Sequence, residues 1–380
     1  MKFLLIYVPN LRFNNDPYKK YNLYEFATRV TRKNKDNVSN LPLTISAQYG
    51  LVDQVSFFNK TVASKDMSGY YLLKNGEFAY NKSYSNDYPW GAIKRLDLYD
   101  MGCLSTLYIC FKTNDNIVNS NYLVHYFESS KWHKQVADIA GEGARNHGLL
   151  NIVVNDFFNT KHAVPTIENQ IKIAGFLDLI EKRIQTQIKI IDDYNSLKMG
   201  IYNCMFKENY ADYKLKQLAY IVKGDQINND QLLSNGSYYM MNGGASPSGY
   251  LDSYNVSENT ISISEGGNSC GYVQFNSSPF WSGGHCYTIQ NVNSALIENK
   301  YLYHYLKYKE KEIMNLRIGT GLPNIQKKDL ENFTILVPSL LIQRKNLALF
   351  EMLDEKISIL NEELANLQKQ KKYLLCNMFI

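Results

Sequence analysis

The chain has 380 residues, 45% of them hydrophobic, and a formal net charge of +5. This length allows two or three domains, and the ordinary apolar content allows a sizeable core. The charge is uneven: residues 1–163 hold 19 Lys and Arg against 14 Asp and Glu, whereas residues 208–336 hold 10 against 12. The basic balance is a weak hint of nucleic acid in the first part and none in the second.

The six cysteines are scattered and form no C-x-x-C pair. This spacing excludes a zinc pattern and a disulfide framework, and it favours reduced core thiols in a cytoplasmic protein. The opening MKFLLIYVPN is too short to span a membrane and is followed by no small-residue cleavage site. We therefore expect an ordered N-terminal strand or arm and no membrane association.

Residues 1–163 carry the signals of a strand-rich domain. Apolar or β-branched runs alternate with Gly, Asn and Asp, and they predict strands at residues 41–46, 69–73, 76–80, 103–111 and 152–154. Residues 121–140 are more helical, with apolar side chains on plausible faces. The prediction is a mixed domain with several strands and a helical segment before residue 164.

Residues 164–206 return as residues 337–379, with a constant offset of 173 and no gap. Each copy opens with Val-Pro and ends with Met-Phe, and Gln170 and Lys172 match Gln343 and Lys345. A repeat of this kind fixes the architecture. In both copies apolar residues recur every three to four positions, which predicts two long helices with a heptad seam. Pro165 and Pro338 suit the helix entrances, where a missing N–H costs nothing.

Lys198 and Lys371 interrupt the two seams at the same place. A polar seam residue can set helix register. A lysine stem packed on the seam, with its ammonium in water, explains the pattern equally well.

Residues 208–336 repeat the first domain loosely, with short strands expected at residues 260–264 and 272–275. The run GLPNI at residues 321–325 echoes GLLNI at 148–152 at the same offset of 173. The repeat unit is therefore a globular domain followed by a helix. We place the boundaries at 1–163, 164–207, 208–336 and 337–380.

No motif for chemistry survives inspection. There is no phosphate-binding loop, no H-E-x-x-H, and no metal spacing among the histidines. The glycine-rich residues 265–271 lack the strand–helix context of a dinucleotide site and are interpreted as a turn. His125 and His304 occupy similar places in the two repeats, and a structural role against the long helix is favoured over a ligand role. The chain is interpreted as a non-enzyme that binds no metal or cofactor.

Two divergent β-rich domains, each followed by the Val-Pro, Gln, Lys, heptad and Met-Phe unit, resemble the specificity subunit of type I restriction–modification systems. The resemblance covers essentially the whole chain, and VPNLRF at residues 8–13 is similar to the family's short opening segment. It implies an α+β fold: two target recognition domains separated by two long helices that form an antiparallel coiled coil with an internal pseudo-two-fold repeat.

The resemblance also implies a function. Each recognition domain is expected to read one half of a split, asymmetric site in double-stranded DNA, with the spacing set by the helices. Two methyltransferase subunits are expected to dock on the helices and to bring S-adenosylmethionine, so catalysis belongs to the partners. The resemblance leaves open whether translocating restriction subunits join. The near-neutral second domain departs from a simple expectation for a DNA-binding surface.

Amide, hydroxyl and basic side chains in loops are the candidates for contacts with bases and phosphates. For each one, an ordinary solvated loop residue is an equally good interpretation. If Lys82 meets phosphate, its replacement by Ala should weaken binding and flatten the salt dependence. The candidates are Gln48, Tyr49, Asn81, Lys82, Ser83, Tyr84, Lys94 and Arg95 in the first domain, and Lys223, Asn242, Asn268, Ser269 and His285 in the second.

The long helices have two interpretations, a simple spacer or a surface that docks the methyltransferases. A pair of helices cannot bury residues all round, and exposed apolar flanks beside the seam favour docking. The predicted flanks are Phe176, Leu179, Ile188, Ile190, Leu349, Ile359 and Leu375.

Two other classes of function compete with this one. A two-domain adaptor on a coiled coil, binding a carbohydrate or peptide, would suit the many tyrosines and asparagines. A fused methyltransferase or nuclease is disfavoured by the missing cofactor and catalytic motifs.

Overall fold

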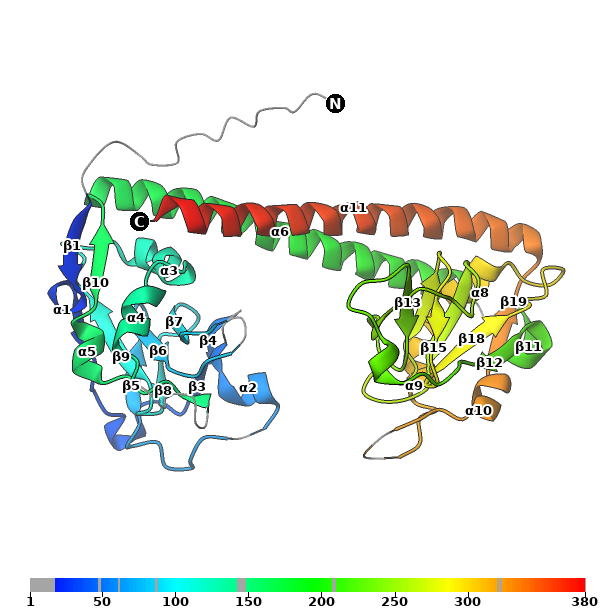
Figure 1. Cartoon of the computed structure of the whole chain (residues 1–380), viewed down its shortest axis with the longest axis horizontal. Coiled ribbons are helices and arrows are strands. Elements are labelled where there is room, and N and C mark those ends of the chain that lie inside the picture. The colour runs from blue at the N-terminus through cyan, green and yellow to red at the C-terminus, as the bar shows by residue number, and fades with distance from the viewer. Residues whose placement is uncertain are drawn as a thin grey trace, which may run out of the picture. The chain divides into compact units, whose positions relative to one another are not determined.

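A computed structural model describes residues 18–46, 49–60, 62–85, 88–141, 148–206, 210–319, 321 and 323–379. It divides into two compact units, residues 1–187 with 363–380, and residues 188–362. The expected N-terminal strand or arm, with the VPNLRF segment, lies outside the described residues. Both long helices are present as single elements, α6 (Ile167–Met205) and α11 (Leu340–Met378), and each unit contains a part of both (Figure 1).

The globular part of the first unit is built on an antiparallel sheet in the order β2-β9-β6-β7. Two further pairs, β3 with β4 and β5 with β8, extend it, and β1 pairs with β10 just before the long helix. Its strands are β1 (Lys19–Asn22), β2 (Ala27–Arg29), β3 (Leu43–Ser46), β4 (Gly50–Asp53), β5 (Tyr71–Lys74), β6 (Phe78–Asn81), β7 (Ala92–Arg95), β8 (Met101–Leu104), β9 (Ile109–Thr113) and β10 (Lys161–Val164). Its helices are α1 (Leu23–Phe26), α2 (Gln54–Phe58), α3 (Ser120–Glu128), α4 (His133–Ile139) and α5 (Val154–Phe158).

The globular part of the second unit follows the same plan. Its antiparallel sheet has the order β12-β18-β15-β16, β11 pairs with β19 before the second long helix, and β14-β13-β17 form a separate sheet. Its strands are β11 (Ala211–Lys214), β12 (Tyr220–Lys223), β13 (Tyr238–Met241), β14 (Gly249–Leu251), β15 (Thr260–Ser264), β16 (Val273–Asn276), β17 (Trp281–Ser282), β18 (Cys286–Gln290) and β19 (Thr334–Val337). Its helices are α7 (Leu215–Leu218), α8 (Asn299–Tyr308), α9 (Glu310–Met314) and α10 (Lys327–Glu331).

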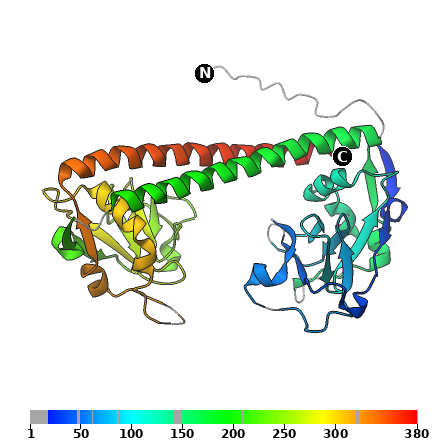
Figure 2. The same ribbon diagram turned by 180° about the vertical axis from the view of Figure 1, so that it is seen from behind.

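Within each unit the segments of α6 and α11 lie side by side, as both views show (Figures 1 and 2). They run antiparallel, because partners along α11 fall in number as those along α6 rise. In the first unit Lys371 pairs with Glu181 at 2.5 Å, and Gln187 donates to Glu363 at 3.1 Å. The buried positions recur every seven residues, as a heptad seam requires; they are Leu177, Ile184 and Ile191 on α6 and Leu353, Leu360, Leu367 and Leu374 on α11.

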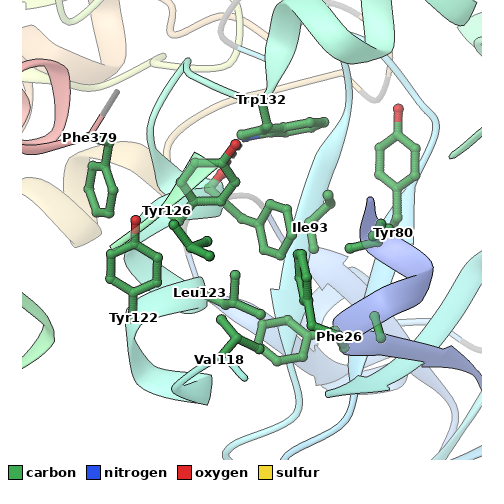
Figure 3. Packing of buried hydrophobic residues seen from close by; sticks show 14 of the residues in the cluster. Phe26, Tyr80, Ile93, Val118, Tyr122, Leu123, Tyr126, Trp132 and Phe379 are labelled. Atoms are coloured by element: carbon green, nitrogen blue, oxygen red, sulfur yellow. Dashed lines mark hydrogen bonds between the residues drawn. The ribbon is translucent and has the colours of Figure 1, made fainter. Parts of the chain in front are cut away.

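The core of the first unit includes the end of α11. Phe379 lies 5.4 Å from the Tyr122 ring and 5.8 Å from the Tyr126 ring, measured between centroids, and Figure 3 shows the three side by side. In the second unit the end of α6 plays this part, since Tyr202 and Phe206 are buried in the core with Phe350. Each long helix therefore begins in one core and ends in the other.

The repeated glutamine at each helix entrance has a structural explanation. The buried Gln170 side chain accepts the N–H of Asn119 at 2.7 Å and donates to Pro165 O at 2.8 Å and Ile117 O at 3.3 Å. Gln343 does the same with Glu298 N–H, Pro338 O and Leu296 O, at 2.8, 2.8 and 2.9 Å. Each glutamine thus ties the start of a long helix to the start of α3 or α8.

The predicted fold class is confirmed: two β-rich globular parts, two long antiparallel helices and an internal repeat. Some predicted elements were wrong. Residues 103–111 form two strands, β8 and β9, because Tyr108 N–H closes a turn onto Ser105 O. Residues 152–154 form no strand and instead lead into α5. Cys204 and Cys376 are exposed on the long helices, while the other four cysteines are buried.

Candidate nucleic-acid interface

A cavity of about 500 Å³ in the second unit brings together residues from four separate loops. Three of the residues that sequence analysis selected line it, namely Lys223, Asn242 and His285, whereas Asn268 and Ser269 lie farther along one wall loop and do not. The remaining lining residues are Gly243, Glu265, Gly266, Gly267, Pro323 and Asn324.

The backbone of these loops is held close together. Asn242 Oδ1 accepts the N–H of His285 at 2.8 Å, which joins the loop after β13 to the loop before β18. Gly243 adopts a φ of +61°, and a Cβ there would lie 3.2 Å from Gly266 O. Only glycine tolerates both conditions well. The cavity wall is therefore built by the sequence and not left by loose packing.

Glu265 is the buried charge of this cavity, and sequence analysis missed it. Its residue exposure is 8%, and Oε1 accepts from Lys223 Nζ at 2.6 Å and from the Tyr287 hydroxyl at 3.0 Å. Burial, and then the Glu265 charge, raise the pKa of the Tyr287 hydroxyl, so that group remains a donor. The only signal in the sequence was a glutamate just before the Gly266-Gly267 pair.

The second carboxylate oxygen of Glu265, Oε2, is buried and has no hydrogen-bond donor among the residues that the structure describes. The nearest cationic group is His285, whose Nδ1 lies 3.5 Å away on a side chain that is 62% exposed. A buried acceptor left unpaired costs roughly 1–3 kcal/mol, more when it is charged. The cavity therefore offers an unused acceptor beside the ammonium of Lys223.

The first-unit candidates are more dispersed. Gln48 lies outside the described residues, and Tyr49 is 65% exposed in the turn between β3 and β4. Asn81 ends β6 and its side chain accepts the N–H of Ser83 at 3.0 Å, while the Tyr84 N–H donates to Gly148 O at 3.2 Å. Residues 81–84 thus form an ordered loop whose exposed side chains include Ser83 and Tyr84.

Lys94 and Arg95 are engaged within the fold. Lys94 forms an ion pair with Glu128, and both side chains are mostly buried. Arg95 donates to Asn121 Oδ1 at 2.7 Å and to Ser120 Oγ at 2.9 Å. These two residues tie β7 to α3, so they are poorly placed as DNA contacts.

The predicted apolar flanks of the helices fall into three groups. Phe176, Leu179 and Ile359 are exposed at 37%, 66% and 44%, and Ile188, Ile190 and Leu349 are half-buried. The expected exposure of Leu375 is wrong, because it is 8% exposed and packs in the first core. Leu179 has an equivalent that sequence analysis did not select, Met352, which is 58% exposed.

The two seam lysines each reach an acidic residue on the opposite helix. Lys371 pairs with Glu181, and Lys198 pairs with Asp354. Glu181 and Asp354 are themselves 173 residues apart, so the two ion pairs are copies of each other. His125 and His304 are buried against these helices, as predicted, with His125 Nε2 2.7 Å from Asp178 and His304 Nδ1 2.7 Å from the Tyr202 hydroxyl.

No described helix is long and apolar enough to cross a membrane. In the described ranges, no group of three or more His, Cys, Asp or Glu side chains is placed to hold a metal ion.

Comparison with known proteins shows where the chain belongs. Residues 207–369 match the type I restriction modification DNA specificity domain. A putative type I specificity subunit of Mycoplasma pneumoniae is 34% identical over 155 residues, 40% of this chain and 41% of that protein. A similar protein of Mycoplasma genitalium is 32% identical over 127 residues, 33% of each chain. The matched stretch thus spans less than half of each of these relatives.

Solved structures share the fold over nearly the whole chain. The S subunit of a type I restriction–modification system from M. genitalium superposes with a TM-score of 0.61, at 18% identity, and covers 98% of this chain and 99% of that one. A second structure, described as bearing on complex assembly of the type I R-M system, gives 0.57 at 18% identity, covering 94% and 96%. The second globular part with its helix is a DNA specificity domain. The chain belongs to the family of type I restriction–modification specificity subunits, which confirms the resemblance found in the sequence.

Proposed function

We propose that this chain is the non-catalytic specificity subunit of a type I restriction–modification complex and that each globular part reads one half of a split site in double-stranded DNA. The observation that carries this proposal is the duplication itself. The two parts share sheet order, the glutamine tie and the paired lysine seam, yet they differ in the loops that follow the sheet. A common scaffold with different loops suits two readers of different sequences.

The long helices would set the spacing between half-sites and dock two methyltransferase subunits, which would bring S-adenosylmethionine. Leu179 and Met352 support the docking role, because they are exposed, apolar and 173 residues apart in the repeat. Two equivalent apolar positions, one in each unit, suit two copies of the same partner.

The test is to map methylated bases in the DNA of cells that carry the full chain with its methyltransferase. The proposal predicts one bipartite, asymmetric motif whose spacer changes, with unchanged half-sites, when residues are added to one long helix. A methylated motif that is short and continuous, or the absence of any motif that depends on this chain, would contradict it.

Docking is tested in the same cells by charged substitutions. Leu179→Asp and Met352→Asp should each weaken co-purification of the methyltransferase at least tenfold, and the double variant should abolish it. Asn195→Asp, at an exposed polar position of α6, is the matched control. Unchanged partner binding in the double variant would leave the helices as a spacer only.

A further inference from the structure

The residue that follows the central strand differs in chemistry between the two units. β6 and β15 are each paired on both sides, and Asn81 and Ser264 end them. The next residues are Lys82 and Glu265. The backbone carbonyl of each accepts an N–H at 2.9 Å from the segment that leads toward the long helix, Leu150 in one unit and Ile325 in the other.

The bridges beside these contacts are also alike, since Ser83 faces Leu149 and Gly266 faces Asn324. Lys82 and Glu265 therefore occupy the same place on the same scaffold. One presents a side chain that only donates hydrogen bonds, and the other a side chain that, when ionised, only accepts them. A position with fixed backbone contacts and opposite side-chain chemistry is where two readers of different sequences should differ.

We propose that Glu265 is a specificity-determining residue that accepts a hydrogen bond from the exocyclic amino group of a cytosine in the major groove of one half-site. Lys223, held beside it, donates to the guanine of the same base pair. This inference rests on the proposed function and names the base pair that the cavity reads.

The unpaired oxygen determines the chemistry of the ligand. Glu265 Oε2 can only accept, so the ligand must donate, and a phosphate, which offers no donor and carries like charge, is excluded. Among major-groove edges the donors are the N4 amino group of cytosine and the N6 amino group of adenine.

Lys223 decides between the two bases. Its Nζ lies 2.6 Å from Glu265 Oε1 and its side chain is half exposed, so a donor stands directly beside the acceptor. A C·G pair presents the complementary arrangement, an amino donor next to the O6 and N7 acceptors of guanine, and lysine to guanine is among the commonest specific contacts. The His285 ring, which lies against Oε2, is exposed enough for its rotation to open that oxygen to the base.

The test is methylation mapping with the full chain and its methyltransferase, comparing wild type with Glu265→Gln and Lys223→Met. The Gln variant keeps the shape of the side chain and adds a donor, which suits adenine. It should change one position of one half-site from a C·G pair toward A·T, with discrimination at that position lowered roughly ten- to a hundredfold. Lys223→Met should relax the same position, and the other half-site should stay intact in both.

Glu258→Gln is the control, because Glu258 is an exposed glutamate of the same globular part, outside the cavity. Thermal unfolding of each purified complex should be unchanged from wild type. The inference is overturned if Glu265→Gln leaves every position unchanged, if it lowers methylation evenly at all sites, if the sensitive pair is A·T in the wild type, or if the two variants affect different positions. A wild-type chain that directs no bipartite motif would instead contradict the proposed function, and the inference with it.

Discussion

The two globular parts differ most at the loops above the sheet and least where they meet the long helices. At the helix entrances the same glutamine makes the same three hydrogen bonds in both units. Above the central strand the first unit presents Lys82 and the second presents Glu265. The comparison teaches that the joint between domain and helix is strictly specified, while the reading position is left free to change.

This contrast also accounts for the uneven charge of the chain. The globular part of the second unit carries two more acidic than basic residues, which is unusual for a surface that meets DNA. An acidic residue that reads a base amino group contributes to recognition although it does nothing for attraction to phosphate. A low net charge in that part is therefore compatible with sequence-specific binding.

The largest expected effect breaks the common joint. Gln343→Ala removes three hydrogen bonds and leaves buried backbone groups unpaired, which should destabilise the second unit by about 3 kcal/mol or more. Hydrogen exchange should show lost protection in α8 and the start of α11, with α3 unaffected, and Gln170→Ala should give the mirror result.

The control for both substitutions is Gln185→Ala, on the exposed side of α6, which should stay within about 0.5 kcal/mol of wild type. Loss of protection in both units from a single substitution would show that the two joints are not independent.

A smaller effect sharpens the contrast at the reading position. Lys82→Met removes the ammonium and keeps the apolar stem, so it should relax one position of the half-site that Glu265→Gln leaves intact, roughly ten- to a hundredfold. Oligonucleotide binding by the assembled complex, with each base pair replaced in turn, measures this. Even weakening across all sequences, with a salt slope lower by about one, would instead place Lys82 on phosphate.

The smallest effect concerns the paired seam. Burial raises the pKa of Glu181, but its hydrogen bonds from Lys371 and Gln185 and the Lys371 charge outweigh burial and hold the pKa below its ordinary 4.5. A carboxyl whose pKa is lowered on folding stabilises the fold above pH 4.5, and this contribution is lost as the pH falls through the lower folded value.

Lys371→Met should therefore cost about 0.5–1 kcal/mol at pH 7, since the pair is partly exposed, and should make the acid loss of stability shallower. Denaturant unfolding at several pH values measures both effects. Lys372→Met, one residue along and exposed, serves as the control. An unchanged pH profile in Lys371→Met would assign the lysine only a packing role.

The sequence predicted the parts of this fold that repeat, because a heptad and a constant offset are local signals. It located both long helices to within three residues of each end and selected Gln170 and Gln343 as matching positions, although it could not show why they match. Their role depends on Asn119 and Glu298, which the chain reaches only after folding.

The candidate site was only partly predictable for the same reason. Lys223, Asn242 and His285 were selected from residue type alone, and nothing local indicates that they share one cavity. Glu265 was set aside as part of a glycine-rich turn, since its burial and its unpaired oxygen arise from contacts between distant loops. Lys94 and Arg95 look free in the sequence, and only α3 shows that they are occupied.

The packing of Phe379 against Tyr122 and Tyr126 has a consequence for how the protein is made. On the ribosome a domain usually folds once its own sequence has emerged, the earlier one first. Here the first core is completed only by side chains near residue 379, which emerge after the whole second globular part has been synthesised. The first unit must therefore wait, with an apolar face uncovered, until its partner segment arrives, and the two units finish folding together.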